Sequence, residues 1–136
     1  MRDTPWTDSL PPSDADFVAL VSAAIAELPE PFASHASSVA VQVVEFAPEA
    51  VLAEMGVADP FELTGLYDGT PLPEKLGGQA LGPDTIWLFR RPILDEWVAR
   101  GDISLGHLVA HVYLHELAHH FGWSDDDIAH VAPWMD

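Results

Sequence analysis

The chain has 136 residues, of which 49% are hydrophobic, and its 22 acidic and 5 basic residues give a formal net charge of -17. The length is typical of one domain with a modest core, and the apolar content excludes general disorder. The negative charge disfavours nucleic acid and anionic membranes as partners, because both repel an acidic surface. The chain has no cysteine, so disulfides and thiolate zinc sites are excluded, and any metal must be bound by histidine and carboxylate side chains.

Residues 1–12 are polar and contain prolines, which predicts a flexible N-terminal arm ahead of one domain over residues 13–136. The arm lacks the basic start and apolar run of a signal peptide. No segment of the sequence approaches the roughly 18 consecutive apolar residues of a membrane span. We therefore expect a cytoplasmic protein that does not act at a membrane.

A helix is predicted over residues 13–28, because apolar side chains recur there at the spacing of one helical face. Either Ser13 or Asp14 suits its N-cap, since a short oxygen-bearing side chain accepts hydrogen bonds from amides of the first turn. Pro29 and Pro31 then end the helix, because proline cannot continue it.

The next segment predicts a strand and a short helix. Residues 39–46 are rich in valine, which favours a strand. Residues 48–55 predict a short helix, and Gly56 suits the left-handed position that ends a helix.

A long loop is predicted over residues 68–84, which carry four glycines and three prolines. Loops of this length in compact domains are often lids over functional sites, and a merely mobile excursion is an equal alternative. Residues 85–90 then have the composition of a strand. Pro92 fits the first turn of a helix that runs to about Ala99.

A longer helix is predicted from a cap at Asp102 or Ser104 to about Phe121, where Gly122 suits the left-handed end. A last short helix is predicted over residues 125–131, because a variant of the capping box opens it. Six apolar residues are expected to supply much of the buried face of the longer helix: Leu105, Leu108, Val109, Val112, Leu117 and Phe121.

The longer helix carries the most informative motif of the chain, H-E-L-A-H followed by Gly122 and Asp125, which together read HExxHxxGxxD. His115 and His119 lie four residues apart, so both project from one helical face and can bind one zinc ion. Glu116 lies about 100° around the helix, and we expect it to act as general base on a water molecule held by the metal. A bare HExxH arises by chance in roughly 2% of such sequences, and the longer motif in roughly one in ten thousand, so the longer motif indicates a metal site.

Asp125 is the candidate for the third ligand. A carboxylate oxygen binds zinc as readily as a third histidine does. Asp126 and Asp127 are neighbouring competitors, and an acidic residue in the first turn of a helix is also favoured by the helix dipole. The spacing predicts one Zn²⁺ per chain, bound by His115, His119 and Asp125.

Three further histidines on the same helix are predicted to be structural. His107 and His111 continue the four-residue spacing upstream, but no carboxylate accompanies them at motif spacing. His120 lies about 100° from His119 around the helix axis and should therefore point away from the metal.

The motif segment 115–125, together with G-L-Y-D-G-T-P-L (65–72) and T-I-W-L-F-R-R-P-I (85–93), resembles the small bacterial zincin-like metallopeptidases. The resemblance implies one compact α+β domain in which a small mixed sheet packs against the HExxH helix. It also implies that strand Ile86–Phe89 lies at the sheet edge and pairs with an extended substrate. The family often has tyrosine where this chain has Phe89, so no hydroxyl is expected there.

The resemblance also implies zinc ligation by His115, His119 and Asp125. With Glu116 as the catalytic residue, the leading hypothesis is a zinc metallopeptidase acting on a peptide or protein substrate. Two alternatives remain: a zinc-stabilised binding or regulatory domain with little or no catalysis, and a hydrolase of non-peptide amides or esters. The group that stabilises the oxyanion is open, with candidates by residue type alone: Tyr67, Arg90 and His130.

Overall fold

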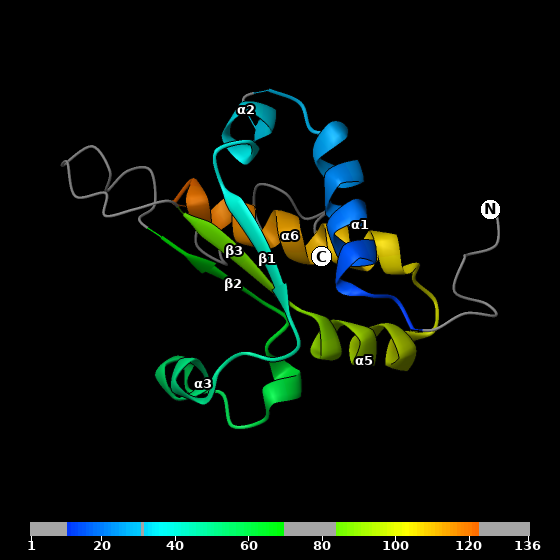
Figure 1. The fold of residues 1–136 in the computed structure, drawn as a ribbon, viewed down its shortest axis with the longest axis vertical. Helices are drawn as coiled ribbons and strands as arrows, with labels where there is room; N and C mark the ends of the chain where they lie inside the picture. Colours follow the sequence, from blue (N-terminus) through cyan, green and yellow to red (C-terminus); the bar gives the residue numbers. More distant parts are fainter. Residues whose placement is uncertain (1–10, 31, 70–83, 123–136) are drawn as a thin grey trace.

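The computed structural model describes residues 11–30, 32–69 and 84–122 (Figure 1). The predicted helix over residues 125–131 and most of the predicted arm and loop lie outside these ranges. In chain order the elements are α1 (Asp14–Ala26), α2 (Phe32–Ala36), β1 (Ala40–Val44), α3 (Glu49–Met55), the 3-10 turn η1 (Pro60–Glu62), β2 (Gly65–Asp68), β3 (Thr85–Phe89), α5 (Arg90–Arg100) and α6 (Leu105–His120).

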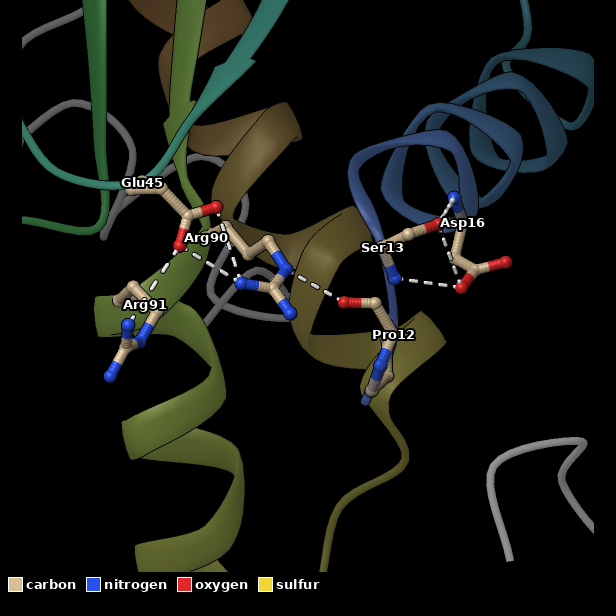
Figure 2. Close-up of polar contacts among 6 residues, drawn as sticks. All are labelled: Pro12, Ser13, Asp16, Glu45, Arg90 and Arg91. Atoms are coloured by element: carbon tan, nitrogen blue, oxygen red, sulfur yellow. Dashed lines mark hydrogen bonds and ion pairs between the residues drawn. The ribbon is translucent and has the colours of Figure 1, made fainter. Parts of the chain in front are cut away.

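Helix α1 begins with a capping box, which Figure 2 shows at atomic detail. The Ser13 hydroxyl oxygen accepts a hydrogen bond from the Asp16 amide at 3.2 Å, and the Asp16 carboxylate accepts one from the Ser13 amide at 2.7 Å. Of the two predicted candidates, Ser13 rather than Asp14 is therefore the N-cap of α1. One turn apart on the inner face, Phe17 and Val21 are buried against the rest of the protein.

The sheet has three strands in the order β1-β3-β2. Strand β1 pairs with β3 in parallel, with Ala40 opposite Thr85, and β2 pairs with β3 in the antiparallel sense, with Gly65 opposite Leu88. The predicted small mixed sheet is confirmed. The expectation that Ile86–Phe89 lies at the sheet edge is wrong, because β3 is the central strand and is paired on both sides.

The two faces of the sheet belong to different apolar clusters, because successive side chains of a strand point in opposite directions. Ile86 and Leu88 are fully buried in the main core together with residues of α1 and α6. Phe89 and Trp87 pack in a smaller cluster with residues of and near α3. In Figure 1, α6 passes behind the sheet, whereas α3 lies below the strands. Phe89 therefore packs with residues near α3.

Helix α5 follows β3 without a break, and its first residue connects three parts of the chain. The Arg90 guanidinium donates from Nε to the Pro12 carbonyl oxygen at 2.7 Å and from Nη1 to the Glu45 carboxylate at 3.0 Å (Figure 2). Pro12 is buried. Arg90 thus ties the segment before α1 and the end of β1 to the start of α5.

Most predicted elements are present with shifts of a few residues at their ends. The strand expected over residues 39–46 is β1, and the short helix expected over 48–55 is α3, which ends at Gly56 with a φ of 72°. The sequence did not predict α2, η1 or β2, each of which has five residues or fewer. None of the helices in the described part of the chain is long and apolar enough to cross a membrane.

Candidate metal centre

Helix α6 carries the motif and is fixed at both ends. Ser104 is its N-cap, since its hydroxyl oxygen accepts a hydrogen bond from the His107 amide at 3.1 Å. At the other end, Gly122 has a φ of 85°, as predicted for a helix stop. Of the six residues expected on the buried face, five are buried, and Phe121 is half-buried. The prediction omitted three further buried residues: Tyr113, Ala118 and His120.

His115 and His119 present their rings close together on the half-buried face of α6. Their ring centroids are 5.1 Å apart and the ring planes are 77° from parallel. A zinc ion bound to one ring nitrogen lies about 3.2 Å from that ring's centroid, so a tetrahedral angle between two ligands separates their centroids by about 5.2 Å. The separation of the two rings therefore agrees with that of two ligands of one tetrahedral metal ion.

His111 and His115 have a different arrangement, although they too are four residues apart. Their rings are nearly parallel, at 29°, and the centroids are 6.4 Å apart. Two ligands of one tetrahedral zinc ion would have centroids only about 5.2 Å apart. The ring geometry therefore favours the downstream histidine pair as the zinc-binding pair, in line with the motif.

A cleft of about 240 Å³ is lined by His111 and His115, and His119 is not among its described lining residues. Its walls come from α6, from the segment that leads into β2 and from Glu96 on α5. The lining contains three carboxylate side chains and neither lysine nor arginine among the described residues: Glu62, Leu63, Thr64, Gly65, Glu96, His111, Val112, His115 and Glu116.

Glu116 projects into this cleft and lies against strand β2. A Cβ atom at Gly65 would come within 3.3 Å of the Glu116 Cγ atom and 2.7 Å of the Val112 Cγ1 atom. Only glycine allows the strand to lie this close to α6. The absence of a side chain at Gly65 therefore leaves the space beside β2 that the Glu116 side chain uses.

Two of the three candidate oxyanion stabilisers are held elsewhere, and neither lines the cleft. The Tyr67 hydroxyl donates a hydrogen bond to the Asp84 carboxylate at 2.7 Å. Arg90 is bound to Pro12 and Glu45. His130 lies outside the described residues.

A buried polar network lies at the end of α6, and the sequence did not predict it as a unit. Asp84, which the sequence placed in the long loop, is only 4% exposed, and His120 is 3% exposed. The His120 Nδ1 atom lies 2.8 Å from the Asp84 Oδ2 atom, which also accepts the hydrogen bond from Tyr67. The prediction that His120 serves a structural role is consistent with these contacts. No sequence signal marks Asp84 as buried.

Within residues 11–30, 32–69 and 84–122, no group of three or more histidine, aspartate or glutamate side chains is arranged to hold a metal ion. Two of the expected ligands, His115 and His119, lie inside these ranges. Asp125, the expected third ligand, lies outside them. The three-residue ligand set therefore stays a prediction, and the described part of the site is a histidine pair with an adjacent carboxylate.

A histidine pair on a helix that packs against a small mixed sheet, with a glutamate beside a cleft, is the arrangement of a zincin-like protein. A family model described as zincin-like metallopeptidase matches residues 36–134. The chain belongs to this family, and membership implies a metal-dependent peptidase with a zinc cofactor. A search of curated proteins finds no significant match to the chain.

Proposed function

We propose that the protein is a zinc metallopeptidase that binds one zinc ion per chain through His115, His119 and Asp125. The observation that carries the proposal is the 5.1 Å separation of the two histidine rings, which suits two ligands of one tetrahedral zinc ion. Asp125 completes the set by sequence spacing, and it follows three residues after Gly122, whose φ is 85°. Family membership supports the choice of metal.

When bound, zinc supplies a Lewis acid that polarises a peptide carbonyl and makes water more acidic. Glu116 takes a proton from the attacking water molecule and later gives it to the leaving amine. Its place in the cleft wall beside His115 supports this role. Its Cγ atom lies 3.3 Å from where a Cβ atom at Gly65 would stand, so the carboxylate is close to the start of β2.

The substrate is proposed to bind in extended form along the outer edge of β2 rather than along β3. Within the described residues β2 is an edge strand that pairs with β3, and an extended peptide added to such an edge forms main-chain hydrogen bonds with it. Residues 62–65, which lead into this strand, line the same cleft as Glu116. The carboxylates of the cleft favour peptides with basic side chains near the cleaved bond.

The test compares wild type and Glu116→Gln, both loaded with zinc, on a library of fluorogenic peptides. General base catalysis typically contributes about 10²- to 10⁴-fold, so kcat should fall at least 100-fold while zinc content stays the same. Glu54→Gln provides the control, because Glu54 is exposed on α3 and carries the same substitution away from the cleft. Its kcat should match wild type.

The outcomes separate the competing functions. Cleavage by Glu116→Gln at the wild-type rate with zinc bound would contradict the role of Glu116. Zinc-loaded wild type that cuts no peptide would favour a zinc-stabilised binding domain. Cleavage of small amides or esters without cleavage of peptides would place the reaction in another hydrolase class.

A further inference from the structure

The buried network at the end of α6 joins three segments that are distant in sequence. Tyr67 comes from β2, Asp84 directly precedes β3, and His120 is the last residue of α6. All three side chains meet at one oxygen atom, since the Asp84 Oδ2 atom lies 2.7 Å from the Tyr67 hydroxyl and 2.8 Å from the His120 Nδ1 atom.

A buried carboxylate is costly unless donors satisfy it. The Tyr67 hydroxyl supplies one donor, and an Nδ1–H group on His120 supplies the other. Gly69 also packs closely against the Asp84 carboxylate, because a side chain at this position would collide with it. The carboxylate therefore fixes the end of β2 and the end of α6 to the start of β3.

Aromatic contacts hold the His120 ring in the same position. Its centroid lies 5.8 Å from that of Tyr67, 5.6 Å from that of Phe121 and 5.8 Å from that of His35 on α2. The ring thus has a hydrogen bond at one nitrogen and neighbouring rings from β2, from α2 and from the adjacent residue Phe121. Such a ring has little freedom to change rotamer.

This anchoring matters because of where His119 lies. His119 is in the last turn of α6, whose final residue is His120, and terminal turns of helices open more readily than their interiors. A ligand at a helix end needs another restraint if it is to stay aligned with His115, one turn earlier. The peptide bond between His119 and His120 transmits that restraint directly.

We propose that Tyr67, Asp84 and His120 form a positioning network for the metal centre. The network holds the last turn of α6 so that His119 faces the same point as His115, and it fixes β2 at the distance that Glu116 requires. The inference rests on the proposed zinc site. None of the three residues touches the metal or the substrate in this scheme, so each acts through its neighbours.

The test measures zinc affinity by competition with a chromogenic chelator in wild type, Tyr67→Phe and Asp84→Asn. Loss of a residue that orients a metal ligand typically weakens binding about 10- to 100-fold, and we expect Kd to rise at least 10-fold in both variants. Tyr113→Phe is the matched control, because Tyr113 is the other of the two tyrosines and its buried hydroxyl has no hydrogen-bond partner among the described residues. Its Kd should equal that of wild type.

Two further readouts separate positioning from a purely structural role. The visible spectrum of the cobalt-substituted protein should change in Tyr67→Phe and stay unchanged in Tyr113→Phe, because it reports ligand geometry. The melting temperature of the zinc-free protein measures folding separately. If Asp84→Asn does not fold, Tyr67→Phe removes only one hydroxyl group and still decides the matter.

Wild-type Kd and an unchanged cobalt spectrum in Tyr67→Phe would overturn the inference, whatever its melting temperature. That result would leave the zinc site itself intact. Wild type that binds no zinc would instead refute the proposed function, and the inference with it.

Discussion

The close contact between β2 and α6 makes Gly65 a sharp test of how the cleft is built. In Gly65→Ala, the new Cβ atom would lie 2.7 Å from the Val112 Cγ1 atom, 3.3 Å from the Glu116 Cγ atom and 3.4 Å from the Trp87 carbonyl oxygen. The first distance is shorter than any normal contact between carbon atoms. Val112 cannot easily move away, because it is only 5% exposed and a β-branched residue in a helix has one strongly preferred rotamer.

The expected effect follows from overpacking a buried site. Extra carbon atoms forced into a packed core cost about 1–3 kcal/mol. Alanine also restricts the unfolded chain, which offsets up to about 1 kcal/mol of that cost. Since the φ of Gly65 is not positive, backbone strain adds nothing, and we expect a net loss of about 1–2 kcal/mol.

Urea denaturation of zinc-free protein measures this loss. The control is Gly106→Ala on α6, where the one described side chain that the new Cβ atom would meet is the end of Leu20 at 3.4 Å. Alanine is favoured over glycine in a helix by about 1 kcal/mol, so this variant should be more stable than wild type. Equal stability of Gly65→Ala and wild type would refute the described packing of β2 on α6.

Three further changes test separate parts of the fold. Burial raises the pKa of Tyr113 from 10.0 to about 12, so the folded state holds the phenol proton more tightly than the unfolded state does. The stability that the neutral phenol contributes is intact below pH 10 and is lost as the pH rises towards 12. Tyr113→Phe should lack that alkaline loss in denaturation curves recorded at pH 9 and 11, and an unchanged pH dependence would contradict the assignment. Arg90→Met removes the hydrogen bonds to Pro12 and Glu45 and should cost about 2 kcal/mol in urea denaturation; an unaltered midpoint would mean that these bonds contribute little. Ser13→Ala removes the cap of α1 and should cost about 1 kcal/mol by the same assay, with a cost near zero arguing against the capping box.

The sequence predicts those parts of the fold that local rules determine. Apolar spacing and cap residues place α1 and α6, and Gly56 and Gly122 occupy the left-handed positions expected of them. Two histidines four residues apart on a helix meet for the same local reason. These features depend on neighbours in the chain, so a single sequence contains the information needed.

The parts that the sequence did not predict depend on contacts between distant segments. Strand β2 has four residues and becomes a strand because it pairs with β3, so its composition alone gives no signal. The same pairing makes β3 central and leaves β1 and β2 at the two edges of the sheet formed by the described strands. Asp84 and His120 are 36 positions apart, and only the tertiary fold brings them together.

The most direct test of the zinc site is metal stoichiometry by elemental analysis. Untagged wild type and Asp125→Ala would be purified without chelator, supplied with zinc and freed of excess metal. We predict about one zinc ion per chain in wild type and loss of most of it in the variant. Wild type without zinc after this treatment would contradict the account, and full retention of zinc by Asp125→Ala would exclude Asp125 as a ligand.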